Sequence, residues 1–322
     1  MDTSHLRAET MEARRRDAPM TSDASDPTRP TGHTASTDPT DPAAPTASTD
    51  PPALARLPGT ARLEVLPTPW IAAEVRAHCP PHRTLTVTAS ESLGLEATVA
   101  LACALRADGH RTVPHLAARM VSGRTHLEDL VGRLESAGVD AVFVPGGDAT
   151  PGPGAYGSSL ELLRDLARMD HPFRDVGVAA YPESHPTIPD AEVVRALADK
   201  APFATEMVSN LCFDPDALTT WIHDVRHRGT TLPLWLGVPG RVDAARLARV
   251  GARIGVGQSL RFLKGRVGTF TRLLTPGGFD TQRLLTRMRA TLEHPASHVA
   301  GLHVYTFNEI AKTEAWLRDA QR

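Results

Sequence analysis

The stretch HLEDLVGRLESAGVDAVFVP, residues 126–145, contains the pattern that decides the fold. Apolar residues in its first part recur at intervals of three and four, which predicts an amphipathic helix. They are Leu127, Leu130, Val131 and Leu134. The apolar run at residues 140–145 then predicts a strand that is buried on both faces, as strands of parallel sheets are. A helix followed by such a strand indicates an α/β fold.

The same alternation continues along the chain in both directions. The predicted strands span residues 61–66, 84–89, 112–117, 140–145, 175–181, 203–209, 232–238 and 301–307. A further amphipathic helix is predicted from the spacing of Leu218, Trp221, Ile222 and Val225. Eight strand–helix units over roughly 260 residues predict one closed (β/α)8 TIM barrel. An open, doubly wound sheet is the alternative, but no GxGxxG sequence follows the first strand.

Two segments depart from this alternation. Residues 1–57 are rich in Thr, Ser, Asp and Pro, and the hexapeptide TASTDP occurs twice in them. Such a composition cannot bury enough apolar surface to fold, so we expect a disordered tail before a barrel domain at residues 58–322. Residues 243–293 are long for one crossover. We expect two or three helices there, with GVGQSLRFLKGR as a candidate active-site segment.

Composition and charge exclude several classes of protein. The net charge of -2 and the lack of a long basic block argue against a nucleic-acid partner. No apolar run reaches the roughly 18 residues that a membrane span needs, and the first residues lack the apolar core of a secretory signal. Cys79, Cys103 and Cys212 are too far apart for a metal site or a disulfide framework. We therefore expect a cytoplasmic enzyme with free thiols and no bound metal; the sequence indicates no oligomeric state.

Polar residues near the carboxyl ends of the predicted strands are the candidates for chemistry, because these ends line the active site of a barrel. Glu64 lies in the apolar first strand, where a carboxylate must be paired, hydrogen-bonded or protonated. It forms either a structural ion pair, for instance with an arginine, or a general acid in a buried site. His115 is either a core histidine or a ligand-binding group, and no second histidine has metal-ligand spacing to it. In YPESHP, two prolines fix a loop that carries Glu183 and His185, which favours a functional role.

Six segments, in this order, resemble the methylenetetrahydrofolate reductase family over about residues 60–320. They are LEVLPTP (63–69), VPHLAAR (113–119), VPGGDA (144–149), VAAYPESHP (178–186), MVSNLCFD (207–214) and GLHVYTFNE (301–309). The resemblance implies a barrel enzyme that reduces 5,10-methylenetetrahydrofolate to 5-methyltetrahydrofolate. It also implies NAD(P)H as the hydride source, and we expect NADH in particular.

The resemblance implies roles for individual residues. Glu64 matches the family's catalytic glutamate and would donate a proton. Asp148 matches the aspartate that stabilises the resulting cation and holds the pterin ring. Substrate-binding positions are implied at Ser209, Asn210, Phe213 and Tyr305. Cofactor-binding positions are implied at Thr88, His115, Tyr181, Glu183, His185 and Lys200.

Three departures from the family's pattern bear on the cofactor. The glycine-rich segment after the second strand is TASESLG here, Gly146 stands where the family has an arginine, and Glu309 stands where arginine is common. The first two changes remove backbone approach and positive charge that a flavin diphosphate needs. FAD, the family's usual cofactor, is therefore doubtful, and the sequence resembles a flavin-independent branch. Arg119 and Lys200 are the candidates for replacing the lost charge.

Two other functions remain open. One is a different folate-dependent one-carbon enzyme on the same barrel. The other is a barrel that binds folate without turnover. The presence of both Glu64 and Asp148 argues against the second, because binding alone requires no acid.

Overall fold

The structure is a computed structural model that describes residues 56–147, 154–185, 187–241 and 279–321. Its eight strands are parallel and form one sheet in the order β3-β2-β1-β8-β7-β6-β5-β4. The strands are β1 (Arg62–Val65), β2 (Thr84–Val87), β3 (Arg111–Pro114), β4 (Ala141–Phe143), β5 (Asp175–Ala180), β6 (Glu206–Ser209), β7 (Leu234–Pro239) and β8 (Val299–Tyr305). A parallel bridge between His115 and Phe143 links the two outer strands and closes the barrel. The predicted (β/α)8 barrel is confirmed, and each predicted strand overlaps an observed one.

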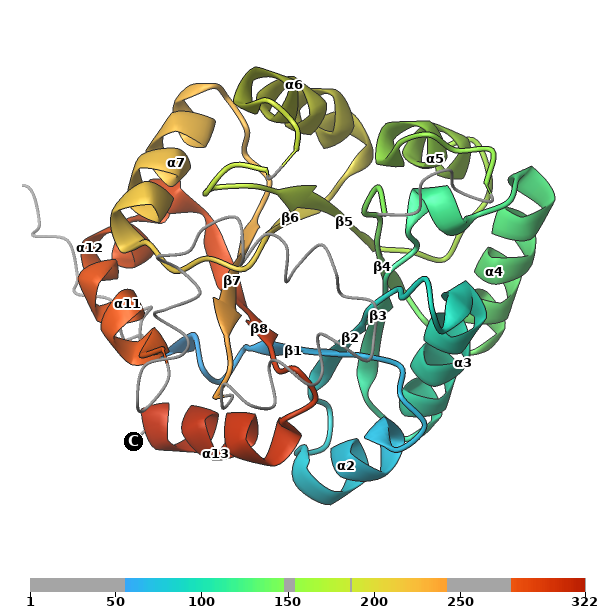
Figure 1. Ribbon diagram of the computed structural model, residues 1–322, viewed down its shortest axis with the longest axis horizontal. Helices are drawn as coiled ribbons and strands as arrows, with labels where there is room; N and C mark the ends of the chain where they lie inside the picture. Colours follow the sequence, from blue (N-terminus) through green and yellow to red (C-terminus); the bar gives the residue numbers. More distant parts are fainter. Residues whose placement is uncertain (1–55, 148–153, 186, 242–278, 322) are drawn as a thin grey trace, which may run out of the picture. The chain divides into compact units, whose positions relative to one another are not determined.

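Helices surround the strands (Figure 1). They are α2 (Ile71–His78), α3 (Gly94–Ala107), α4 (Arg124–Ser136), α5 (Ser159–Leu166), α6 (Asp190–Lys200), α7 (Pro215–His227), α11 (Thr281–Arg287), α12 (Arg289–Glu293) and α13 (Ile310–Ala320). The four leucine and valine positions that predicted α4 are all buried. In α7, Leu218, Ile222 and Val225 are buried, whereas Trp221 is only partly so. Two helices lie within residues 281–293, whereas most of the segment expected to contain two or three helices, including GVGQSLRFLKGR, falls outside the described residues.

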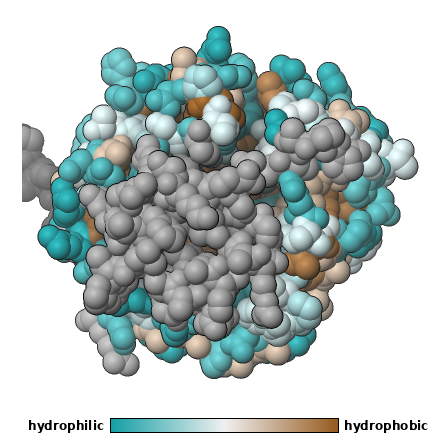
Figure 2. Space-filling model, in the orientation of Figure 1, coloured by the Kyte–Doolittle hydropathy of each residue, from teal (hydrophilic) through white to brown (hydrophobic). Residues whose placement is uncertain are grey.

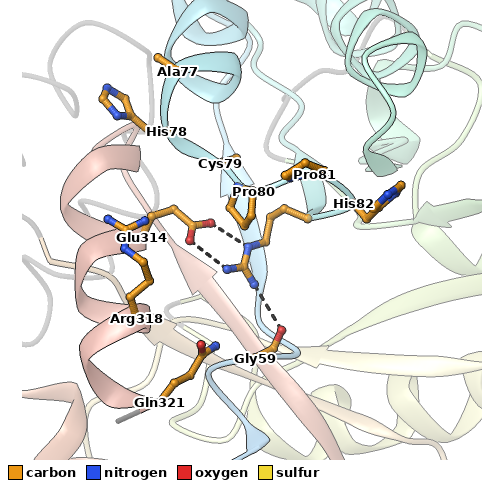
Figure 3. A pocket seen from close by; sticks show the side chains of 11 residues that line it. Gly59, Ala77, His78, Cys79, Pro80, Pro81, His82, Glu314, Arg318 and Gln321 are labelled. Carbon is orange, nitrogen blue, oxygen red and sulfur yellow. Dashed lines mark hydrogen bonds and ion pairs between the residues drawn. The ribbon is translucent and has the colours of Figure 1, made fainter.

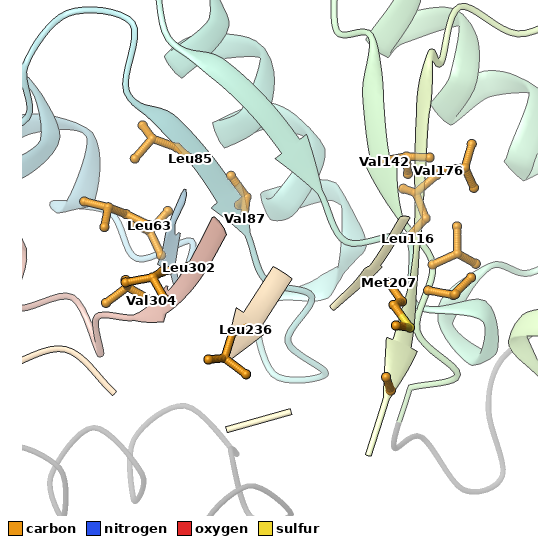
Figure 4. Packing of buried hydrophobic residues seen from close by; sticks show 14 of the residues in the cluster. Leu63, Leu85, Val87, Leu116, Val142, Val176, Met207, Leu236, Leu302 and Val304 are labelled. Carbon is orange, nitrogen blue, oxygen red and sulfur yellow. The ribbon is translucent and has the colours of Figure 1, made fainter. Parts of the chain in front are cut away.

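The main apolar core lies between the strands and the helices. It includes Leu63 and Leu85 of the neighbouring strands β1 and β2, and Leu236 and Val304 of β7 and β8 (Figure 4). These side chains alternate with the residues that face the barrel interior, as the two-residue period of a strand requires. Leu57 also belongs to this core and is 4% exposed, so the packed domain already includes this residue.

A buried ion pair fills the amino-terminal end of the barrel interior. The Arg62 guanidinium donates two hydrogen bonds to the Glu206 carboxylate, one of them from Nη2 to Oε2 at 2.8 Å. Trp235 Nε1 donates to the same Oε2 at 2.9 Å, and its ring lies 3.5 Å from the Arg62 guanidinium carbon. The ring occupies the space that a Cβ on Gly301 would need. Among the described residues, this end of the barrel interior is therefore filled by packed side chains.

A second ion pair joins the last helix to Arg83, the residue directly before β2. Arg83 Nε and Nη2 donate to the two carboxylate oxygens of Glu314 on α13, at 2.7 and 2.9 Å. The pair lines a surface hollow of about 490 Å³ that also contains Cys79 (Figure 3). Burial, reinforced by the Glu314 charge, raises the pKa of the Cys79 thiol to about 12. The thiol therefore stays protonated at neutral pH. None of Cys79, Cys103 and Cys212 forms a disulfide bond in the described structure.

Two further properties of the described residues bear on function. None of their helices combines the length and the apolar character that crossing a bilayer requires. They also contain no group of three or more His, Cys, Asp or Glu side chains placed to hold a metal ion. On the face seen in Figure 2, the described surface is largely hydrophilic.

Candidate active site

Glu64 of β1 projects into the barrel interior and meets two histidines there. Its Oε2 lies 3.0 Å from Nε2 of His303 on β8 and 4.0 Å from Nε2 of His115, which follows β3. Strand register explains the first contact, because Glu64 pairs with Tyr305 and Arg62 with His303 across β1 and β8. The side chains of Arg62 and Glu64 therefore point into the barrel interior together with those of His303 and Tyr305. The Glu64 side chain is 14% exposed, against 2% for His303 and 8% for His115.

This arrangement shows that the partner of Glu64 among the described residues is not an arginine. The buried arginine of the interior, Arg62, pairs with Glu206 and not with Glu64. The partner of Glu64 is a histidine, which carries a full charge only when it is protonated. The Glu64 carboxyl group is thus partly accessible and lies inside the barrel near its carboxyl-terminal opening. Its neighbour, the His303 imidazole, can also bind a proton.

His115 is a buried and neutral neighbour of this carboxyl group. Burial lowers the pKa of its imidazole to about 4, with the nearby Glu64 opposing this effect and His303 adding to it. Its ring lies 4.7 Å from the Phe143 ring and 6.4 Å from the His303 ring, measured between centroids. At neutral pH the imidazole therefore adds no positive charge beside Glu64.

Tyr305 lies above His303 on β8, with the two ring centroids 4.9 Å apart. Its hydroxyl donates to the backbone oxygen of Ser209 at 3.2 Å. Burial, followed by the Glu64 charge, raises the pKa of Tyr305 well above its ordinary value. The phenol is therefore a neutral donor beside the carboxyl group.

The loop after β8 fixes the backbone around Glu64. Thr306 Oγ1 donates to the Glu64 carbonyl oxygen at 2.6 Å. The Asn308 amide accepts from the Leu66 backbone N–H at 2.8 Å and donates to the Leu66 carbonyl oxygen at 3.2 Å. Asn308 has a φ of 61°, a left-handed conformation that asparagine tolerates better than most residues. The backbone is thus fixed at Glu64 itself and at Leu66, two residues further along the chain.

The predicted substrate residues after β6 divide into one accessible and two buried positions. Asn210 is partly exposed, whereas Ser209 is fully buried and its Oγ accepts a hydrogen bond from Gly237 N at 2.7 Å. Phe213 is also buried, and its ring packs edge-on against the Phe279 ring. Cys212 Sγ donates to the Asn210 carbonyl oxygen at 3.0 Å. Of these residues, Asn210 is the partly exposed one, and its Oδ1 lies 3.6 Å from Cys212 Sγ.

The predicted YPESHP loop is tied to the loop after β6. Glu183 is 3% exposed, and its Oε1 accepts from the backbone N–H groups of Phe213 and Asp214 at 2.6 and 2.8 Å. His185 Nδ1 accepts from the N–H groups of Thr187 and Ile188 at 3.2 and 3.1 Å. These bonds favour the neutral ring with its proton on Nε2, and burial lowers the pKa of His185.

Tyr181 lies at the carboxyl end of β5 beside this loop. Its ring centroid is 4.9 Å from that of His185, with the planes nearly perpendicular. Tyr181 and His185 therefore form an aromatic pair at the mouth of the barrel.

The remaining predicted cofactor residues are placed as follows. Thr88 Oγ1 is buried and has no hydrogen-bond partner among the described residues. Lys200 is buried at the end of α6, and its Nζ donates to the Ala179 carbonyl oxygen at 3.2 Å. Burial lowers the pKa of Lys200 to about 8. Arg119 donates to the carbonyl oxygens of Gly157 and Gly147, and Asp148 lies outside the described residues.

His303 lies in the family-like segment GLHVYTFNE, but the sequence predicted no role for it. Its position two residues before Tyr305 in a predicted strand already placed both side chains on one face. The contact with Glu64 could not be predicted, because it depends on the register between β1 and β8, which lie far apart in the sequence. Glu64 and His303 are separated by 239 residues.

Comparisons with known proteins identify the family of the chain and agree with its fold. A family model described as methylenetetrahydrofolate reductase matches residues 74–251, more than half of the chain. An uncharacterized protein from Clostridium thermocellum, described as binding two copies of 5-methyl-5,6,7,8-tetrahydrofolic acid, has a similar structure with a TM-score of 0.56. The identity is 11%, over 81% of this chain and 94% of that chain, so this likeness concerns the fold.

A plant class V chitinase mutant from Cycas revoluta, in complex with (GlcNAc)3, is less similar. Its TM-score is 0.42 and its identity 11%, over 81% of this chain and 99% of that chain. A likeness of this strength carries no argument about the site.

Proposed function

Because the chain belongs to the methylenetetrahydrofolate reductase family, we propose that it reduces 5,10-methylenetetrahydrofolate to 5-methyltetrahydrofolate with NAD(P)H. The observation that carries the proposal is the partly exposed carboxyl group of Glu64, clamped at the inner end of the mouth beside His303. The structurally similar protein from Clostridium thermocellum, described as binding 5-methyltetrahydrofolic acid, supports a folate ligand. We further propose that the enzyme acts in the cytoplasm.

The proposed chemistry begins with a proton transfer. Glu64 gives its proton to N10 of the folate, the bond between N10 and the bridging methylene breaks, and its electron pair stays on N10. The methylene carbon is left as an iminium cation on N5. A positioned acid is worth about 10² to 10⁴ in rate. Asp148 is the proposed counter-charge for this cation, and Asn210 the proposed hydrogen-bonding partner of the pterin.

The second step is hydride transfer to the iminium carbon. NADH is the proposed source, and it leaves as NAD⁺ while the methylene becomes a methyl group. The hydride carries two electrons from NADH to the folate, and the Glu64 carboxylate recovers its proton from solvent. Tyr181 and His185, paired at the mouth, are the proposed residues that hold the nicotinamide dinucleotide.

We propose that this hydride transfer needs no stoichiometric FAD. A flavin diphosphate requires cations or free backbone N–H groups. The two candidate cations are already engaged, Arg119 with two glycine carbonyl oxygens and Lys200 with Ala179 O. The exposed Glu91, in the loop after β2, would add negative charge. The described residues therefore fit a flavin diphosphate poorly, and a yellow protein, or activity only on adding FAD, would contradict this proposal.

Glu64→Gln tests the proposed function, because it removes the transferable proton and hardly changes the volume. We expect the rate of NADH oxidation with 5,10-methylenetetrahydrofolate to fall by about 10² or more, with folate binding preserved. Glu128→Gln is the matched control, since Glu128 is in a surface ion pair with Arg124 and should leave the rate unchanged. A near-normal rate in Glu64→Gln would show that Glu64 is structural. Formation of methyl-folate without NADH oxidation would indicate another folate-dependent one-carbon enzyme. Tight folate binding without any product would indicate a barrel that only binds folate.

A further inference from the structure

We propose that His303 is a positioning residue for Glu64: it holds Oε2 as a permanent hydrogen-bond acceptor, so that the transferable proton is carried on Oε1. This inference rests on the proposed function of Glu64 as the acid. It assigns different tasks to the two oxygens of one carboxyl group.

The contacts that Glu64 makes with its neighbours are asymmetric. Both histidines approach the same oxygen, Oε2, at 3.0 Å for His303 and 4.0 Å for His115. Among the described residues, no side chain or backbone group makes a corresponding contact with Oε1. The two imidazole rings are roughly parallel, 27° apart, and both are buried. Both imidazole rings therefore lie on the Oε2 side of the Glu64 carboxyl group.

The surroundings of His303 favour one tautomer of its ring. Its Nδ1 is buried and has no hydrogen-bond partner among the described residues. A proton on Nδ1 would leave a buried donor unsatisfied, whereas a proton on Nε2 is donated to Glu64 and leaves only a lone pair at Nδ1. The neutral ring with its proton on Nε2 is thus favoured. Because Oε2 of Glu64 accepts a hydrogen bond from this Nε2–H, the proton of the neutral carboxyl group is carried by Oε1.

The bond from His303 strengthens during proton transfer. When Oε1 releases its proton, negative charge spreads to Oε2, and this bond becomes charge-assisted. An interaction that strengthens as charge develops lowers the barrier rather than merely binding the ground state. The other ionisable groups that face Glu64 do not compete for this task. His115 is neutral because burial lowers its pKa to about 4, and Tyr305 donates instead to Ser209 O.

Three variants of position 303 test the role of the donor. The amide nitrogen of glutamine reaches about as far as Nε2 of histidine, so His303→Gln keeps a donor toward Oε2. The amide of asparagine reaches only as far as Nδ1, and His303→Leu has no donor. We expect kcat to fall by about 10- to 100-fold in His303→Leu and His303→Asn, with KM for the folate within about two-fold of the wild type. His303→Gln should recover most of kcat.

A pH profile separates positioning from packing. Glu64 must be protonated to act, so activity falls as pH rises through its titration. Loss of the donor favours the protonated form, and the alkaline limb of kcat should move up by about 1 to 2 pH units in His303→Leu and stay in place in His303→Gln. His110→Gln is the matched control for replacing a buried histidine, because His110 bonds to Arg83 O away from the site. It should leave the limb unchanged.

An infrared titration of the Glu64 carboxyl band, assigned by its absence in Glu64→Gln, needs no turnover. If the wild type does not oxidise NADH, the proposed function fails, yet the band should still titrate higher in His303→Leu than in His303→Gln. Equal titrations in these two variants would overturn the role of His303 even in an active enzyme. If His303→Leu does not fold, His303→Asn takes its place in the comparison with His303→Gln, because both are amides and only the longer one reaches Oε2.

Discussion

Replacing Glu206 with glutamine should destabilise the barrel strongly, because it leaves the Arg62 guanidinium buried without a counter-charge. Both side chains are nearly inaccessible, at 4% for Arg62 and 6% for Glu206. Removing one partner of a buried ion pair typically costs about 3–5 kcal/mol. For a domain of this size each kcal/mol lowers Tm by about 2–4 °C, so the expected loss is about 6–20 °C. Calorimetry or urea denaturation of Glu206→Gln measures it directly.

Two further variants show whether the uncompensated charge is the cause. The surface pair between Asp216 and Arg287 has a similar separation, 2.8 Å, but is largely exposed, so Asp216→Asn should cost less than about 1 kcal/mol. In the double variant Arg62→Met/Glu206→Gln the charge is gone and the glutamine can still accept from Trp235 Nε1, so much of the lost stability should return. A loss below about 1 kcal/mol in Glu206→Gln, or a double variant as unstable as the sum of both single ones, would refute the reasoning.

Two more predictions concern stability. The unfolded chain protonates His115 near pH 6.5 and the folded protein only near pH 4, so the free energy of unfolding should fall by about 3 kcal/mol as pH drops through this window. His115→Gln should flatten this slope in urea titrations, and an unchanged slope would mean that His115 protonates normally. Deletion of residues 1–57 removes the buried Leu57, whereas deletion of residues 1–55 keeps it, so the longer deletion should be less stable by about 1.5–3 kcal/mol. Equal denaturation midpoints for the two truncations would contradict the packing of Leu57.

The barrel could be predicted from the sequence because its signals are local. The apolar spacing in α4 and the short apolar runs of β4 and β5 each identify an element within a few residues of chain. Eight repeats of one unit then leave few architectures open. The expected helices after β7 followed from the length of the crossover alone.

The side-chain partners could not be predicted, because they depend on register between distant strands. The sequence identified Glu64 as an unusual carboxylate and allowed an arginine partner. A shift of β1 by one residue would have turned Glu64 toward the helices. The observed register instead pairs Arg62 with His303 and Glu64 with Tyr305, which sends the arginine to Glu206 and the histidine to Glu64.

Two carboxyl groups in the described part of the barrel interior thus have different partners, an arginine for Glu206 and a histidine for Glu64, and the difference suits their positions. Glu206 lies at the closed end, where the Arg62 guanidinium donates hydrogen bonds to both of its oxygens. Glu64 lies two residues further along β1 than Arg62, toward the mouth, and its ion-pair neighbours among the described residues are His303 and His115. An arginine there would hold the carboxylate ionised and prevent it from giving a proton. A histidine orients the group and still allows it to exchange its proton with a ligand, which is what a general acid requires.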